Sequence, residues 1–233
     1  AAVDAVVSGA VAGGEIPGVA AIAATRSGVI YQGAFGVADL PSRRPLRNDA
    51  IFRIASMTKP VTSTALMQLV EAGRLRLDDP ASKYLPELAD LKVFERFDAR
   101  TGAYTLRPAK RAITVRHLLT HTAGFGYNFT NPIVRDFKPR EGEQYAAGPL
   151  VFEPGERWLY GTNTDWVRRL VEAISGQPLE TYFRERIFAP LGMRETFYNV
   201  PEDTRGRVVT VHRRTGDTAF TVEAVQPPLT NPR

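Results

Sequence analysis

Two apolar runs separated by a short polar turn predict a β-hairpin near the start of the chain. Residues 19–24 and 29–35 are strand-like, and Arg26, Ser27 and Gly28 lie between them. Strand-like runs on both sides of a Ser-Gly turn are typical of a hairpin. Because a lone hairpin is only marginally stable in water, further strands or helices must pack on it. This requirement constrains the fold more than any other feature of the sequence.

A long block after the hairpin carries helical signals. Apolar residues recur at helical spacing over 61–70 and 166–174, and Gly73 and Gly176 follow where C-cap glycines belong. Thr114 is placed to cap a short helix that continues to residue 119. The order of elements is therefore a hairpin, then helices, then a return of strand-like sequence after residue 207.

This order predicts an α/β (α+β) fold with three segments. Residues 1–45 form the first part of a sheet domain, as a helix and the hairpin, and residues 46–199 form a mostly helical domain. Residues 200–233 return towards the sheet domain and leave it incomplete, because the proline-containing end offers no strand to finish a sheet. We therefore expect the C-terminal strands of the sheet to be absent from this chain.

Composition excludes several classes of function. The 233 residues contain no cysteine and three histidines, so we expect no disulfide, no metal site and no cofactor. The formal charge of +5 is spread among acidic residues, which argues against nucleic-acid binding. No apolar run approaches the length of a membrane span. The missing cysteines and missing signal segment favour the cytoplasm, although a removed export signal leaves the same sequence.

The tetrapeptide Ser56-Met57-Thr58-Lys59 is the first candidate for chemistry. Residues three apart on a helix share a face, so the Lys59 amine can reach the Ser56 hydroxyl and take its proton. Pro60 favours a helix that begins at about Ser56, which puts this hydroxyl at the positive end of the helix dipole. On these residues alone, a serine that only caps the helix is the alternative.

Two further segments hold residues that could act with Ser56. The Pro-Gly turn at 154–155 predicts that Tyr160 leaves a loop just before the next helix. Taken alone, a tyrosine at such a place is most often a packing residue with a locally bonded hydroxyl. His121 lies just beyond the short helix, and we interpret it as a structural hydrogen bonder rather than a catalytic base.

Taken together and in this order, these segments resemble the serine β-lactamase and penicillin-binding-protein superfamily. The branch they resemble most holds family VIII carboxylesterases and class C β-lactamases. The resemblance covers nearly the whole chain, through the strand end at Gly36, the Ser56 motif with the sequence up to Leu75, and residues 118–124, 152–160 and 190–193. It implies a β-lactamase-like antiparallel sheet flanked by helices, with the helical domain inserted in it.

The resemblance also implies roles for individual residues. Ser56 corresponds to the nucleophile that becomes acylated, Lys59 to the group that accepts or relays its proton, and Tyr160 to the general base or proton shuttle. Because these groups are coupled, which of the two takes the proton stays open. The loop after residue 124 borders the site in this family, so Tyr127 and Asn128 are expected to face the substrate.

The sequence departs from the family pattern in two places. Class C β-lactamases carry Tyr-x-Asn, whereas Thr162 stands here and Asn163 follows one residue late, as a displaced candidate for substrate binding. The third motif of the family, a Thr-Gly or Trp-x-Gly type of strand, is absent, and Arg214-Thr215-Gly216 predicts a hairpin turn instead. Further residues or a second chain are expected to supply that strand.

The expected function is that of a serine hydrolase that forms an acyl-enzyme. We expect a carboxylesterase acting on small, short-chain esters, because the residue two after Tyr160 is not the asparagine of the lactamases. The first alternative is a β-lactamase or D-amino-acid-specific peptidase with the same Ser-Lys-Tyr machinery. The second is a non-catalytic penicillin-binding-like protein, against which the presence of all three residues argues.

Overall fold

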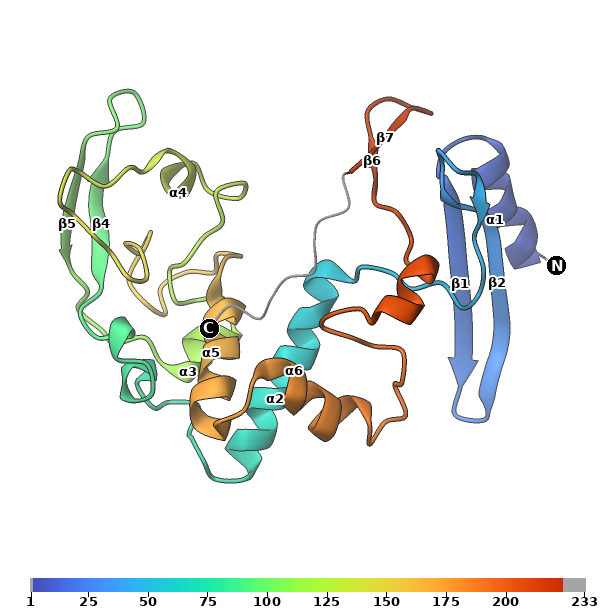
Figure 1. The fold of residues 1–233 in the computed structure, drawn as a ribbon. Helices are drawn as coiled ribbons and strands as arrows, with labels where there is room; N and C mark the ends of the chain where they lie inside the picture. The colour runs from blue at the N-terminus through green and yellow to red at the C-terminus, as the bar shows by residue number, and fades with distance from the viewer. Residues whose placement is uncertain (1, 224–233) are drawn as a thin grey trace. The chain divides into compact units, whose positions relative to one another are not determined.

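The computed structural model describes residues 2–223 of the chain (Figure 1). The chain divides into two compact units, one made of Ala1–Ala55 with Glu195–Arg233 and the other of Ser56–Arg194. We call them the sheet unit and the helical unit. The domain boundaries expected after residues 45 and 199 stay predictions, and what was expected of residues 224–233 lies outside the described residues.

The sheet unit is built on the predicted hairpin, which is confirmed. Strands β1 (Gly18–Thr25) and β2 (Gly28–Asp39) pair antiparallel, and helix α1 (Ala2–Ala12) packs on them (Figure 1). At the open end of the hairpin Gly36 has a φ of +80°, and a Cβ there would collide with the Pro17 carbonyl. Only glycine fits this close approach.

A third strand, which was not predicted from the sequence, extends the sheet after β2. The short β3 (Arg44–Pro45) pairs antiparallel with the end of β2, and the backbone N–H of Leu46 donates to the Gly36 carbonyl at 3.0 Å. The sheet therefore has the order β1-β2-β3. The proline can join because it lies in an edge strand, where its missing N–H costs no ladder bond.

A second hairpin of the sheet unit lies near the end of the described residues. Strands β6 (His212–Arg214) and β7 (Phe220–Val222) pair antiparallel after the 3₁₀ segment η5 (Glu202–Arg207). The turn between them contains Thr215 and Gly216, so the predicted hairpin turn is confirmed. Strand β6 begins later than the strand-like sequence at 207–211, where Val208 forms only an isolated bridge with Ile51.

The helical unit is organised around two helices, α2 (Thr58–Glu71) and α5 (Asn163–Ser175), which pack on each other. Helices α3 (Val115–Leu119) and α6 (Leu179–Phe183) pack against them, and a π-helical turn, η4 (Arg184–Phe188), continues α6 (Figure 1). The fully buried apolar side chains of these elements include Leu66, Val115, Leu118, Val167, Leu170, Val171, Leu179 and Phe183. The smaller helical elements are α4 (Pro132–Asp136) and the 3₁₀ turns η1 (Ala55–Met57), η2 (Ala81–Lys83) and η3 (Pro86–Leu88).

The ends of these helices follow local sequence signals. Thr114 caps α3 as predicted, because its side chain accepts from the backbone N–H of His117 at 3.2 Å. Gly73 and Gly176, after α2 and α5, have φ values of +67° and +72°, in the left-handed region. Helix α2 begins at Thr58 rather than at Ser56, because η1 precedes it.

One hairpin of the helical unit was not predicted. Strands β4 (Lys92–Phe97) and β5 (Tyr104–Pro108) pair antiparallel within the segment expected to be mostly helical. Edge-to-face contacts of Phe94 with Tyr104 and Phe137 cover one side of it. The contact with Phe137 joins residues more than forty positions apart, which local patterns do not reveal. Over residues 2–223, no helix combines the length and the apolar character that crossing a bilayer requires.

Candidate active site

Ser56 lies in the 3₁₀ turn η1 immediately before helix α2, and its side chain is exposed. The preceding residue, Ala55, has a φ of +43°, a left-handed conformation that is uncommon for a residue with a Cβ. Helix α2 begins at Thr58, directly after this turn, so Ser56 lies near the positive end of the α2 dipole. The helix dipole can therefore stabilise negative charge that develops beside the Ser56 hydroxyl.

Two side chains of the helical unit converge on the Ser56 hydroxyl. The Tyr160 hydroxyl donates to Ser56 Oγ at 2.7 Å, and the Lys59 ammonium donates to the same oxygen at 3.2 Å. Lys59 Nζ also lies 4.8 Å from the centre of the Tyr160 ring. The fold therefore brings together the three residues that the sequence singled out, although Tyr160 is 104 positions from Ser56.

Tyr160 is held in place by its backbone. Thr130 Oγ1 donates to the Tyr160 carbonyl at 3.1 Å. A Cβ at the next residue, Gly161, would collide with the Phe125 carbonyl and lie 2.5 Å from the Gly126 Cα, far closer than real Cβ contacts. The loop segment that carries Tyr160 thus runs directly against residues 125–126. Glycine at position 161 permits this close contact of the two backbones.

Lys59 and Tyr160 shift each other's pKa in opposite directions. Hydrogen bonds to Lys59, and then to Ser56, lower the pKa of the Tyr160 phenol. Burial pulls the pKa of Lys59 down, but its hydrogen bonds to Tyr160 and Tyr127 outweigh burial and raise this pKa overall. Both shifts favour an ammonium beside a phenol that gives up its proton more readily than usual.

Four rings form a row along the site, which we call the aromatic row. The rings of Phe129 and Tyr127 stack at 4.8 Å, those of Tyr127 and Tyr160 lie 5.6 Å apart, and those of Tyr160 and Trp158 stack at 6.3 Å. Phe129 is 75% exposed and Trp158 is 66% exposed. The row presents an apolar surface on both sides of Tyr160, and large exposed rings of this kind are typical of binding surfaces.

The three expected substrate contacts lie in different places. Tyr127 belongs to the aromatic row, with Lys59 Nζ 5.6 Å from its ring centre, and Asn128 follows it as an exposed residue of the loop. Asn163 is fully buried at the start of α5, so its side chain lies inside the unit rather than at the exposed site. The expected contact of Asn163 with the substrate stays a prediction, and the burial of its side chain argues against it.

The Asn163 amide instead contacts His121, the residue interpreted as a structural hydrogen bonder. Asn163 Nδ2 lies 3.0 Å from His121 Nδ1, and the imidazole centre lies 4.9 Å from the Tyr160 ring centre. Burial, and then the charge of Lys59, lower the pKa of His121. Sequence reasoning missed Thr130 and Trp158 as parts of the site, because each is placed there by tertiary contacts and carries no motif of its own.

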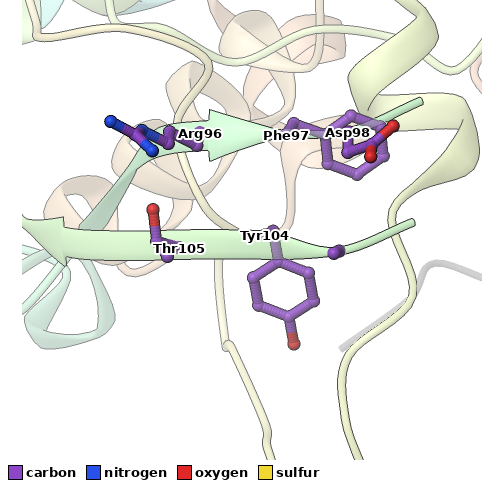
Figure 2. A pocket seen from close by; sticks show the side chains of 6 residues that line it. Arg96, Phe97, Asp98, Tyr104 and Thr105 are labelled. Atoms are coloured by element: carbon purple, nitrogen blue, oxygen red, sulfur yellow. The ribbon is translucent and has the colours of Figure 1, made fainter. Parts of the chain in front are cut away.

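One cavity of the helical unit is separate from these residues. This cavity of about 480 Å³ lies at the turn end of the β4–β5 hairpin, and Figure 2 shows Phe97 at the end of β4, Asp98 just beyond it and Tyr104 on β5. None of the residues that line this cavity takes part in the hydrogen bonds around Ser56. In residues 2–223, no cluster of three or more histidine, aspartate or glutamate side chains is placed to hold a metal ion.

Proteins named as an acyltransferase and as an esterase are among those similar to this chain. The family model described as Beta-lactamase matches residues 3–230. Acyltransferase mokF of Monascus pilosus is 38% identical over 226 residues, which cover 89% of this chain and 54% of that protein. Lovastatin esterase of Penicillium rubens is 37% identical over 211 residues, which cover 84% of this chain and 53% of that protein.

The fold is shared with a solved structure. Unliganded simvastatin synthase of Aspergillus terreus superposes with a TM-score of 0.83 at 33% identity, covering 94% of this chain and 60% of that chain. This match confirms the expected mixed fold of helices and antiparallel strands. The chain spans about half the length of the curated relatives that it matches.

Proposed function

Because this chain belongs to the beta-lactamase family, we propose that it forms an acyl-enzyme at Ser56 and passes the acyl group to water or to an alcohol. The observation that carries the proposal is the convergence of Tyr160 and Lys59 on the Ser56 hydroxyl, at 2.7 and 3.2 Å. A serine hydroxyl is a weak nucleophile until an adjacent base takes its proton, and both groups are within reach of that proton.

We assign the base to Tyr160 rather than Lys59. The raised pKa of Lys59 keeps its amine protonated, and the lowered pKa of Tyr160 makes its phenolate more accessible. Ser56 Oγ attacks the ester carbonyl as its proton passes to the Tyr160 oxygen. The tetrahedral intermediate collapses when Tyr160 returns this proton to the departing alkoxide, which leaves the acyl group on Ser56.

The second half of the cycle uses the same groups in reverse. Water or an alcohol gives its proton to Tyr160 and attacks the acyl carbon, and Ser56 Oγ leaves with that proton. Lys59 stays an ammonium and stabilises the phenolate in both halves. The positive end of the α2 dipole stabilises the oxyanion of each tetrahedral intermediate.

Short-chain esters with apolar alcohol or acyl portions are the proposed substrates. The aromatic row offers such groups an apolar surface beside Ser56, and the chain has Thr162 where the lactamase pattern has asparagine. The relatives named acyltransferases and lovastatin esterase support ester chemistry with either acceptor. Hydrolysis of a β-lactam or a D-amino-acid peptide by the same three residues is the second candidate.

We also propose that further polypeptide, as additional residues or a second chain, completes the sheet unit. In the described residues β1 is an edge of its sheet, and Ile22 and Ile30 on this hairpin are 65% and 70% exposed. An exposed apolar edge strand is a template for pairing with another strand. The relatives, about twice as long as this chain, are long enough to contain such strands.

Covalent labelling tests the acyl-enzyme directly. The purified chain is treated with a fluorophosphonate, and the adduct is located by intact mass and peptide mapping. We expect one adduct, on Ser56, and none in Ser56→Ala, while Ser63→Ala, a serine-to-alanine control within α2, labels like the wild type. No adduct, or an adduct on another serine, contradicts the proposal.

Turnover separates the candidate substrates. A p-nitrophenyl butyrate assay with and without added butanol is compared with a chromogenic cephalosporin assay. We expect ester turnover, with butyl butyrate as a second product when butanol is present, and little cephalosporin cleavage. Preferential cephalosporin cleavage supports the lactamase alternative, and labelling without any turnover supports neither substrate class.

A further inference from the structure

The Asn163 side chain occupies a buried position where four segments of the helical unit meet. Its amide nitrogen lies 3.0 Å from His121 Nδ1 and 3.4 Å from each of the backbone carbonyl oxygens of Phe125 and Leu159, so its two hydrogens are shared among three acceptors. The side chain has no exposed surface. A buried amide with this many partners fixes the groups around it more firmly than a solvated one.

The two carbonyls determine which way the amide points. A carbonyl oxygen only accepts, so Phe125 and Leu159 both require the NH₂ end of Asn163 on their side. The same nitrogen faces His121, and the backbone N–H of Gly161 also points at Nδ1, at 3.5 Å. His121 Nδ1 is therefore surrounded by donors and must act as an acceptor. The proton of the neutral ring then resides on Nε2.

The alternative orientation of the amide is unfavourable. Asn163 Oδ1 is buried, and it has no hydrogen-bond partner in the part of the chain that the structure describes. Rotating the amide would direct this oxygen at the two carbonyls and remove their donor. One buried acceptor without a partner is less unfavourable than an arrangement in which Oδ1 and the two carbonyl oxygens face one another.

The His121 ring is fixed with respect to Tyr160. The residue has a left-handed φ of +56°, and its carbonyl accepts from the backbone N–H of Leu159 at 2.9 Å. The imidazole centre lies 4.9 Å from the Tyr160 ring centre, tilted by 40°. The Asn163 amide therefore contacts His121, and His121 contacts the Tyr160 ring, whose hydroxyl donates to Ser56.

We propose that Asn163 holds His121 as the neutral Nε2–H imidazole, and that His121 is a positioning residue that orients the Tyr160 ring towards Ser56. A protonated ring would lose the Asn163 hydrogen bond and would add a positive charge near Lys59, the charged group that faces it. The proposal rests on the proposed function through the role of Tyr160, but the state of His121 is measurable without any turnover.

The first test reads the tautomer of each histidine in the full chain. Long-range ¹H–¹⁵N correlation spectra of ¹⁵N-histidine-labelled protein contain only three rings. We expect His121 as Nε2–H. The other two act as references, because His117 Nδ1 accepts from the Thr114 N–H at 3.2 Å and His212 Nε2 accepts from the Leu40 N–H at 3.1 Å. His117 should share the Nε2–H pattern, and His212 should show the opposite one.

The second test reverses the hydrogen bond. Asn163→Asp replaces the donor by an acceptor of the same shape, so Nδ1 of His121 should gain a proton, while Asn48→Asp makes the same change at an exposed position of the sheet unit. Titration of ¹³C-labelled tyrosine follows Tyr160, whose signal is identified by its absence in Tyr160→Phe. We expect the lowered pKa of Tyr160 to return towards its ordinary value in Asn163→Asp only. Labelling of Ser56 should slow about 100-fold, as for a group displaced by about 1 Å.

The outcomes separate this inference from the proposed function. An Nδ1–H form of His121 in the wild type overturns the inference, and so does a reversed tautomer in Asn163→Asp with unchanged Tyr160 titration and labelling. If Asn163→Asp does not fold, His121→Asn, which tolerates the left-handed φ, replaces it in the Tyr160 titration. A wild type that shows the expected tautomer and Tyr160 titration but never labels at Ser56 supports the inference and contradicts the proposed function.

Discussion

The two units of the chain differ in how much apolar surface they bury. Nearly all buried apolar side chains of the described residues belong to the helical unit, and the sheet unit contributes Ala38 and Leu46. The sheet unit instead exposes large apolar residues, among them Val6, Ile22, Val29 and Ile30. Since burial of apolar side chains is the main stabilising contribution to folding, the helical unit is expected to hold its shape far more firmly.

This difference is informative because every candidate residue of the site lies in the helical unit. Ser56 and Lys59 are at the start of α2, whose inner face is buried, and Tyr160 precedes α5, which packs on α2. Catalytic groups require supports that keep distances within about 0.5 Å, and well-packed helices provide them. The sheet unit holds its strands mainly through backbone hydrogen bonds and polar side-chain contacts.

Removal of the Tyr160 hydroxyl or the Lys59 amine gives the largest expected effect. Tyr160→Phe and Lys59→Met should each reduce ester turnover by about 10³- to 10⁴-fold, and the double variant by little more, because the two act as one proton-transfer assembly. Tyr31→Phe deletes the same hydroxyl in the sheet unit, where it donates to Asp4, and should leave turnover unchanged. Losses that multiply in the double variant would show that the two groups act independently.

Matched truncations test the difference in burial itself. Leu66→Ala, at a fully buried position of α2, should reduce the free energy of unfolding by about 2–5 kcal/mol. Ile30→Ala, at a position 70% exposed, should change it by less than about 0.5 kcal/mol. Both tryptophans, Trp158 and Trp166, lie in the helical unit, so their fluorescence follows its unfolding, and circular dichroism follows the whole chain. Equal losses in the two variants would mean that Ile30 is covered in solution.

Acid should weaken the sheet unit through Asp39. Hydrogen bonds from the Ser42 hydroxyl and backbone N–H, and then from Thr210, lower the pKa of Asp39 to about 2. A carboxyl whose folded pKa lies below its unfolded value stabilises the protein above the unfolded value, and this contribution is lost as pH falls through about 2. Thermal midpoints of the wild type and Asp39→Asn should therefore converge between pH 4 and pH 2. If the difference between the two thermal midpoints stays constant from pH 4 to pH 2, the lowered pKa of Asp39 does not contribute to stability.

The smallest expected effect concerns substrate choice within the helical unit. Tyr127→Ala removes a ring from the middle of the aromatic row, and should change the ratio of kcat/KM between butyrate and octanoate esters by about 3- to 10-fold. Tyr145→Ala, which removes a ring from the cluster around Phe137, is the matched control. A change in stability with an unchanged ratio would assign Tyr127 to packing alone.

Local signals in the sequence were sufficient for much of the fold. The Ser-Gly turn predicted the first hairpin, and Thr114, Gly73 and Gly176 marked helix ends that the structure confirms. Strand β3 and the β4–β5 hairpin were missed for different reasons. Pro45 makes β3 resemble a loop, and the aromatic contacts that cover β4 and β5 come from residues distant in sequence.

The candidate site shows the same limit. Lys59 is three residues from Ser56, so helical spacing predicted their contact, which is 3.2 Å. Spacing alone could not bring Tyr160 to Ser56, and that expectation came from the family resemblance. Neither source indicated that Asn163 would be buried against His121, because this position follows from the close passage of two loops.

The close passage at Gly161 makes one position of the chain intolerant of any side chain. Only a hydrogen atom fits between Gly161 and residues 125–126, whereas its neighbour Thr162 is half-buried and caps α5 without a side-chain hydrogen bond. In a library randomised at both codons and selected for ester turnover, we expect glycine alone at 161 and a broad set of residues at 162. Substitutions at Thr162 can then vary the proposed substrate specificity without displacing Tyr160, because the close contact of the backbone is made at Gly161 and not at Thr162.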